Sequence, residues 1–98
     1  MARITDEQVE TVRALVAAVP PGRVTTYGDV AAAAGLTSPR IVGTILRTDG
    51  HDLPWHRVLR ASGVPPEHIA TEQLARLRTE GVLADDGRIP LAAYRLVR

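Results

Sequence analysis

The sequence predicts a mainly α-helical fold that contains a helix-turn-helix. Two observations predict this class: apolar residues recur at helical spacing near the N-terminus, and two further short helices flank a tight turn at Leu36-Thr37. Two short helices joined in this way are typical of a helix-turn-helix. With 98 residues, the chain is expected to form one domain, residues 1–98.

The first helix is predicted over residues 6–19. Thr5 and Gln8 have the spacing of a capping box, and residues 20–22, Pro-Pro-Gly, end the helix. The apolar residues that recur along one face of this segment are Val9, Val12, Leu15, Val16 and Val19. The segment is therefore expected to be amphipathic.

The next two helices begin and end at recognisable signals. Thr26, with Asp29 three residues later, resembles a second capping box, and Gly35 is a typical C-terminal stop, which together predict a helix over residues 27–34. Ser38 as N-cap and Pro39 at the first helical position predict a third helix that runs to about Thr48.

The third predicted helix divides into two faces. The apolar face holds Ile41, Val42, Ile45 and Leu46. The opposite face holds Arg40, Gly43, Thr44 and Arg47. Because a glycine lies between two arginines, a nucleic-acid backbone could approach this helix closely. An ordinary solvated face with a tolerated glycine fits the same residues, and the pattern alone favours that reading.

The C-terminal half is expected to be less regular. A brief strand is predicted at residues 58–59, and a helix capped by Thr71 is predicted to end at Gly81. A turn follows at residues 85–87. The tail, residues 89–96, is expected to begin with a strand and to pack its apolar side chains back on the domain.

The composition excludes several kinds of chemistry. The chain has no cysteine, which rules out disulfides, thiolate zinc sites and thiol catalysis. His51, His56 and His68 lack any regular metal-ligand spacing, so we expect neither a metal nor a cofactor. No apolar run approaches the roughly 20 residues that span a bilayer, and no secretory signal is visible, so a cytoplasmic protein is expected.

The net charge of +1 conceals a local bias. Every one of the 12 cationic side chains is arginine, which a genome that prefers arginine codons would explain equally well. Four of these arginines, Arg40, Arg47, Arg57 and Arg60, cluster in a stretch with only two acids, and codon preference does not explain that clustering. Arginine suits phosphates and can stack on bases.

Residues 54–58, Pro-Trp-His-Arg-Val, resemble the active-site signature of the O6-alkylguanine-DNA alkyltransferases, which reads Pro-Cys-His-Arg-Val. In those enzymes the cysteine accepts the alkyl group. Trp55 stands at that position here, and indole is not a usable nucleophile at neutral pH. The chain therefore resembles the alkyltransferase-like proteins, a family that binds O6-alkylguanine in DNA without repairing it.

Three further segments carry the resemblance between about Val9 and Val82. They are residues 21–31, 38–43 and 80–82. The resemblance implies the winged-helix-like C-terminal domain of an alkyltransferase standing alone. It also implies a monomer whose partner is double-stranded DNA containing O6-alkylguanine, and recruitment of nucleotide excision repair proteins.

The resemblance also implies which residues form the site. Those expected to contact DNA are Thr26, Tyr27, Ser38, Arg40, Gly43, Thr44 and Arg47. Those expected around the lesion are Trp55, His56, Arg57, Val58, His68 and Glu80. Arg40 would replace the extruded nucleotide from the minor groove, and Tyr27 would crowd the target phosphate. From the residues alone, Arg40 could instead contact a phosphate, and Tyr27 or Trp55 could be core aromatics.

The implied roles around the lesion differ from one residue to the next. Trp55 would form a flat wall for the flipped base, and the backbone of Val58 would face the base edge. His56 and Glu80 match a proton relay and would remain as structural hydrogen-bond partners, while Arg57 would brace the domain.

Two departures from the enzymes affect the lesion pocket. The relay asparagine has no counterpart in residues 48–53, and the loop that covers the pocket is replaced by residues 64–69, where His68 is the nearest candidate for a covering side chain. Two alternatives remain open. One is a small transcription factor with residues 39–48 in the major groove, and the other is a residual alkyltransferase or a hydrolase that uses His56.

Overall fold

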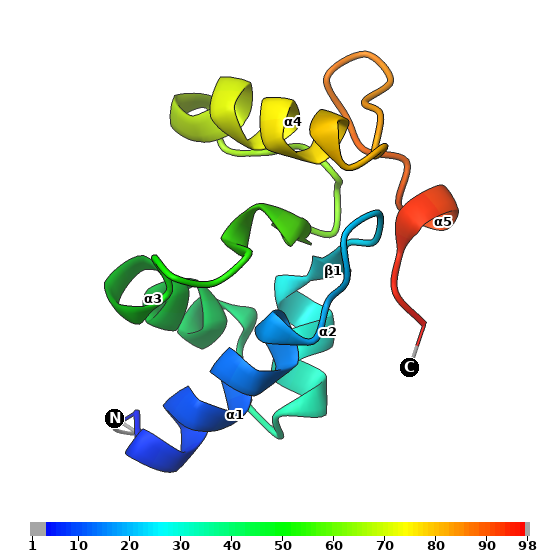
Figure 1. The fold of residues 1–98 in the computed structure, drawn as a ribbon. Helices are drawn as coiled ribbons and strands as arrows, with labels where there is room; N and C mark the ends of the chain where they lie inside the picture. Colours follow the sequence, from blue (N-terminus) through cyan, green and yellow to red (C-terminus); the bar gives the residue numbers. More distant parts are fainter. Residues whose placement is uncertain (1–3, 98) are drawn as a thin grey trace.

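The computed structural model describes residues 4–97, and it is mainly helical (Figure 1). Its helices and strands, in chain order, are α1 (Asp6–Ala17), β1 (Thr25–Thr26), α2 (Tyr27–Ala33), α3 (Pro39–Asp49), the 3-10 turn η1 (Trp55–Arg57), β2 (Val58–Leu59), the 3-10 turn η2 (Glu67–Ile69), α4 (Ala70–Thr79) and α5 (Leu91–Tyr94). The predicted fold class is confirmed.

The predicted starts of the first three helices are confirmed in detail. In α1 the Thr5 hydroxyl accepts the Gln8 N–H at 3.1 Å, and the Gln8 side chain accepts the Thr5 N–H at 2.9 Å. Thr26 caps α2 by accepting the Asp29 N–H at 3.0 Å. Ser38 caps α3 by accepting the Arg40 N–H at 3.1 Å. Because these bonds join residues of a single turn, the local sequence was enough to predict them.

The turn between α2 and α3 is closed by Gly35. Its φ of 71° lies in the left-handed region that favours glycine. The N–H of Leu36 then reaches back to the carbonyl of Ala31 at 2.9 Å, which ends α2 in a Schellman motif. This sharp reversal brings α3 against α2.

Two hydrophobic clusters hold the domain together. The first joins α1, α2 and α3 and includes the buried side chains of Val12, Val30 and Ile45. The apolar face of α3 is as predicted except for Ile41, which is only partly buried. The second cluster joins the chain around β1 and β2 to α4 and the tail; its buried members are Val24, Leu59, Leu77, Val82 and Ile89.

A small parallel sheet connects the two clusters. β1 pairs with β2 so that Thr25 lies opposite Val58 and Thr26 lies opposite Leu59. The residue before β1, Val24, makes a parallel bridge with Arg95 of the tail. The strand predicted at Val58–Leu59 is therefore present, and it links the chain after Trp55 to the chain before Tyr27.

The C-terminal half differs from the predictions in two places. Thr71 does not cap α4, because the helix already begins at Ala70, where the turn η2 leads directly into it. The tail does not begin with a strand. Ile89 is buried, Pro90 precedes the short helix α5, and strand-like pairing comes only at Arg95. Pro90 lacks the N–H that a strand ladder would need.

Two other predictions for this half are confirmed. α4 ends before Gly81, whose φ is 85°, and the N–H of Val82 reaches the carbonyl of Leu77 at 3.0 Å. The predicted turn at residues 85–87 is a tight hairpin with φ values of 53° at Asp86 and 76° at Gly87. Among residues 4–97, no helix has the length and apolar character needed to cross a membrane.

Candidate nucleic-acid interface

An open groove of about 1120 Å³ lies between α3 on one side and η2 with α4 on the other. It brings together six of the predicted site residues from four elements: Tyr27, Arg40, Gly43, Arg47, Trp55 and His68. These residues are far apart in the sequence, and the fold brings them together in the lining of one groove. The groove is therefore the candidate site.

One wall of the groove is formed by the start of α2 and the exposed face of α3. Tyr27 is partly buried. Burial raises the pKa of its phenol, and the positive charge of Arg60 lowers that pKa by a smaller amount. Arg40 is exposed in the first turn of α3. At Gly43, an added Cβ would meet no atom within 4 Å. The helix surface is thus open between its two arginines, as the sequence predicts.

Trp55 belongs to η1 and lines the groove. The Arg76 guanidinium of α4 lies over its ring, 5.4 Å from the ring centroid, and His56 meets it edge-on with ring centroids 6.1 Å apart. Arg76 is in turn held by Glu72 at 2.9 Å. Trp55 is therefore a partly buried aromatic surface with a cation above it, rather than a core residue.

Arg60, Glu72 and Arg76 line the groove and were not predicted as site residues. The spacing of Glu72 and Arg76 indicates that they share a helix face, but nothing local indicates that this face meets Trp55. The lining includes four arginines, Arg40, Arg47, Arg60 and Arg76, and Glu72 is its one acid. The groove is thus strongly cationic although the whole chain carries only +1.

A hydrogen-bonded network lies behind the groove and holds η1 in place. Glu80 faces His56 Nε2 at 2.8 Å, and the Arg57 guanidinium donates to both Glu80 oxygens at 3.0 and 2.7 Å. Arg57 also donates to the carbonyl of Val19 at 2.9 Å. Hydrogen bonds from Arg57, and then from His56, lower the pKa of Glu80 to about 2 although burial opposes the shift.

Four residues predicted around the lesion therefore do not line the groove. His56, Arg57 and Glu80 form the network just described, and Val58 is buried with its carbonyl accepting the Gln73 amide at 3.1 Å. These four residues support η1, the turn that carries Trp55, on the side away from the groove.

Three residues predicted to contact DNA also lie outside the groove lining. Thr26 is buried and its hydroxyl caps α2, and the Ser38 hydroxyl caps α3. The Thr44 hydroxyl donates to the carbonyl of Arg40 at 3.1 Å within α3. The polar atoms of these side chains thus make hydrogen bonds within α2 and α3, the helices that form one wall of the groove. Residues 4–97 contain no group of three or more acidic or histidine side chains that could hold a metal ion.

A helix-turn-helix whose second helix faces an open, arginine-lined groove defines a DNA-binding domain. The chain belongs to the family described as the 6-O-methylguanine DNA methyltransferase DNA-binding domain, whose model matches residues 7–82. The resemblance drawn from the sequence is therefore confirmed.

Relatives in this family share much of the chain. It is 44% identical over 91 residues to the DNA base-flipping protein of Escherichia coli (strain K12), covering 83% of this chain and 67% of that one. It is 35% identical over 86 residues to a bifunctional methyltransferase/endonuclease of Picrophilus torridus, covering 83% of this chain and 29% of that one.

A solved structure matches nearly the whole chain. The crystal structure of S. pombe Atl1 in complex with damaged DNA containing O6-carboxymethylguanine superimposes with a TM-score of 0.86 and 28% sequence identity. The match covers 99% of this chain and 100% of Atl1. The similarity thus includes the tail beyond residue 82 as well as the shared domain.

Proposed function

We propose that this protein recognises O6-alkylguanine in duplex DNA without repairing it, by flipping the damaged nucleotide into the groove beside Trp55. One observation carries the proposal: Tyr27, Arg40 and Trp55, from three different elements, line a single cationic groove. The names of the relatives, which include DNA base flipping and binding of damaged DNA, support it.

Flipping a base requires a group that pushes, a group that fills the gap and a pocket that receives the base. In this proposal α3 lies along the minor groove, and the backbone of the DNA approaches it at Gly43. Arg40, exposed in the first turn of α3, enters the stack in place of the nucleotide. Tyr27 crowds the phosphate of that nucleotide from the start of α2, and Arg47 binds phosphate further along the helix.

The extruded base stacks on Trp55. An indole wall offers a large apolar surface, which suits a purine that carries an alkyl group. Arg76, which lies over this wall, moves aside to admit the base, and His68 lines the same groove. Thr26 has no part in DNA contact in this proposal because its side chain is buried.

The absence of repair follows from the chemistry of the acceptor position. Alkyl transfer needs a nucleophile that can attack the alkyl carbon, and a thiolate is the group that the related enzymes use. The sequence has tryptophan at that position and no cysteine anywhere. His56 cannot substitute for it, because it is buried behind Trp55 with its Nε2 against Glu80.

A protein that binds a lesion without repairing it is useful only if the lesion passes to another system. We therefore propose that the complex with damaged DNA recruits nucleotide excision repair proteins. In this proposal the protein acts as a monomer, and it binds at the nucleoid in the cytoplasm. The bound DNA carries an extruded nucleotide, and this gives the repair proteins a structure that undamaged DNA lacks.

A competition assay tests the proposal. A labelled duplex with a single O6-methylguanine is bound to the protein and displaced by the same duplex with guanine, at several salt concentrations. We expect preference for the lesion, and a slope of log K against log salt of about −3 to −4.5, as for roughly three to five neutralised phosphates.

The same assay separates the alternatives. Preference for one undamaged sequence, with no effect of the lesion, would indicate a transcription factor. Loss of the alkyl label from the DNA during incubation would indicate an enzyme. A slope near zero would contradict the proposed contacts with phosphates.

A further inference from the structure

We infer that the C-terminal segment, residues 91–97, braces the first turn of α2 and thereby positions Tyr27 for nucleotide flipping, with Arg95 as the principal positioning residue. This inference rests on the proposed function. It assigns a role to a segment that lies beyond the family match, which ends at residue 82.

The backbone of the segment is hydrogen-bonded to both the N–H and the carbonyl of Val24, the residue before β1. The N–H of Val24 donates to the carbonyl of Tyr94 at 3.0 Å, and the carbonyl of Val24 accepts the N–H of Leu96 at 2.7 Å. In an extended chain, the backbone groups of successive residues point to opposite edges. Thr25 therefore turns its groups the other way, toward β2.

Residues 24–26 thus lie between the tail and β2, and they lead without a break into Tyr27. β2 in turn follows directly on η1, which carries Trp55. The three paired segments therefore set the distance between the residue proposed to push the nucleotide and the residue proposed to receive the base. The tail closes one edge of this arrangement.

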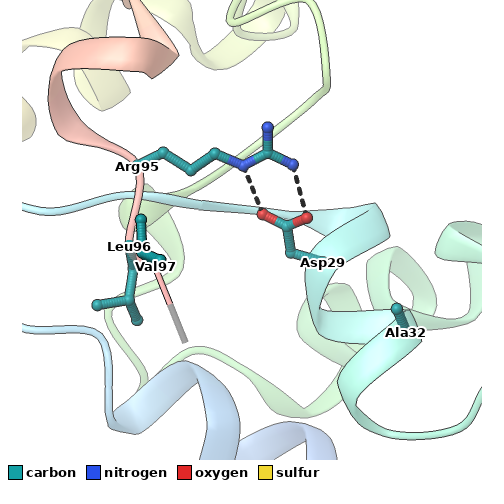
Figure 2. Close-up of a pocket in the computed structure, with 5 residues that line it drawn as sticks. All are labelled: Asp29, Ala32, Arg95, Leu96 and Val97. Atoms are coloured by element: carbon teal, nitrogen blue, oxygen red, sulfur yellow. Dashed lines mark hydrogen bonds and ion pairs between the residues drawn. The ribbon is translucent and has the colours of Figure 1, made fainter.

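The side chain of Arg95 adds a second attachment, on α2 itself. Its Nε donates to Asp29 Oδ2 at 2.8 Å and its terminal nitrogen donates to Asp29 Oδ1 at 2.7 Å (Figure 2). Asp29 lies in the first turn of α2, two residues after Tyr27. A two-point contact between a planar guanidinium and a carboxylate restricts rotation as well as distance. The tail therefore holds the strand before Tyr27 through the backbones of Tyr94 and Leu96, and the helix after it through the side chain of Arg95.

The pair also matters for charge. Tyr27 and Gly28, which line the groove, immediately precede Asp29. A carboxylate this close to the path of the DNA would repel phosphates, and the guanidinium of Arg95 neutralises it. Both partners are partly exposed, with relative accessibilities of 48% for Arg95 and 29% for Asp29. Breaking the pair should therefore perturb the start of α2 without unfolding the domain.

The test compares Arg95→Gln with Arg78→Gln in the full chain. Arg78 is an exposed residue of α4 outside the groove lining, so its substitution removes the same charge elsewhere. The measured quantity is the ratio of affinities for an O6-methylguanine duplex and its undamaged counterpart. We expect Arg95→Gln to lower this ratio by about 2- to 5-fold, the range typical of one exposed ion pair. Arg78→Gln should leave it unchanged, and Arg95→Lys should restore part of it.

A second comparison distinguishes positioning from general stability. In a Tyr27→Ala background, Arg95→Gln should cause no further loss of discrimination, because the residue through which it acts is absent. Thermal unfolding of each variant checks the fold, and Asp29→Asn, which removes the pair from the other side, should reproduce the loss if Arg95→Gln proves unstable.

The inference is overturned if the ratio is unchanged in a folded Arg95→Gln variant, or if the loss is equally large in the Tyr27→Ala background. Failure of the proposed function looks different, since the wild-type protein would then show no preference for the lesion at all.

Discussion

Arg76 lies over the indole of Trp55, and its guanidinium carbon is 5.4 Å from the ring centroid. The guanidinium is held there by Glu72, one helical turn earlier in α4. The helix α4 therefore supplies a stacking partner to the aromatic surface that we propose receives the base. Because carbon atoms in contact lie about 3.5 to 4 Å apart, a base cannot fit between the two without moving Arg76.

Trp55 should report this rearrangement directly. It is the one tryptophan of the sequence, and its surroundings would change when a purine stacks on it. We expect its emission to change when an O6-methylguanine duplex is titrated to saturation, and to change much less with undamaged duplex at equal occupancy. Unchanged emission in the saturated lesion complex would show that Trp55 does not contact the base.

Arg40→Ala should weaken binding of the lesion duplex by about 1 to 3 kcal/mol, because the gap left by the flipped nucleotide would remain unfilled. Fluorescence anisotropy with a labelled duplex measures the change. Arg78→Ala, also an exposed helical arginine but outside the groove lining, is the control for charge. Equal effects of the two substitutions would mean that Arg40 contributes only its charge.

Gly43→Ala should separate stability from binding. An added Cβ has open space around it, and alanine is favoured over glycine inside a helix by about 0.5 to 1 kcal/mol, so the free energy of unfolding should rise. The same methyl group occupies the surface that the DNA backbone is proposed to approach, so affinity should fall. Denaturant unfolding and DNA titration of the same preparation give both values. A variant that is more stable and binds equally well would exclude close approach at this residue.

Glu80 should make stability depend on acid pH. Its pKa is lowered from 4.5 to about 2 in the folded protein by the hydrogen bonds from Arg57 and His56. A carboxyl with a depressed folded pKa stabilises the fold fully above its unfolded pKa, and this contribution is lost as pH falls from about 4.5 to about 2. The loss should amount to at most about 3 kcal/mol.

Unfolding by denaturant at a series of pH values from 7 to 2 measures this dependence. Glu80→Gln is expected to be less stable at pH 7, since it leaves Arg57 without its charged partner. Its stability should also vary less across the acid window. An unaltered pH profile in the variant would mean that other carboxyl groups cause the acid sensitivity.

Trp55→Cys should not create an efficient alkyltransferase, although it restores the family signature. Efficient attack needs a thiolate with a lowered pKa held in line with the alkyl carbon. His56 already faces Glu80, but the relay asparagine is absent, and a pocket shaped around indole would confine the smaller sulfur poorly. Incubation with an O6-methylguanine duplex followed by protein mass measurement detects the methyl adduct. Stoichiometric methylation within minutes would refute this expectation.

The sequence by itself determined the first three helices, the end of α4 and the family. The capping box of Thr5 and Gln8, the Ser38-Pro39 start of α3 and the glycine stop at Gly35 each depend on contacts within one or two turns, so they can be read locally. The prediction that Thr71 caps α4 was wrong because a preceding 3-10 turn, which has no comparable local signature, begins the helix earlier.

Only the tertiary structure decided which side chains share the groove. Tyr27, Arg40 and Trp55 meet there as the resemblance implies, but Arg76 over Trp55 and Arg95 on Asp29 depend on how α4 and the tail pack against the first three helices. The same packing places His56, Arg57 and Glu80 behind the groove rather than in it. Local sequence sets the backbone of each element within a few residues, whereas contacts between elements depend on the burial of apolar faces far apart in the chain.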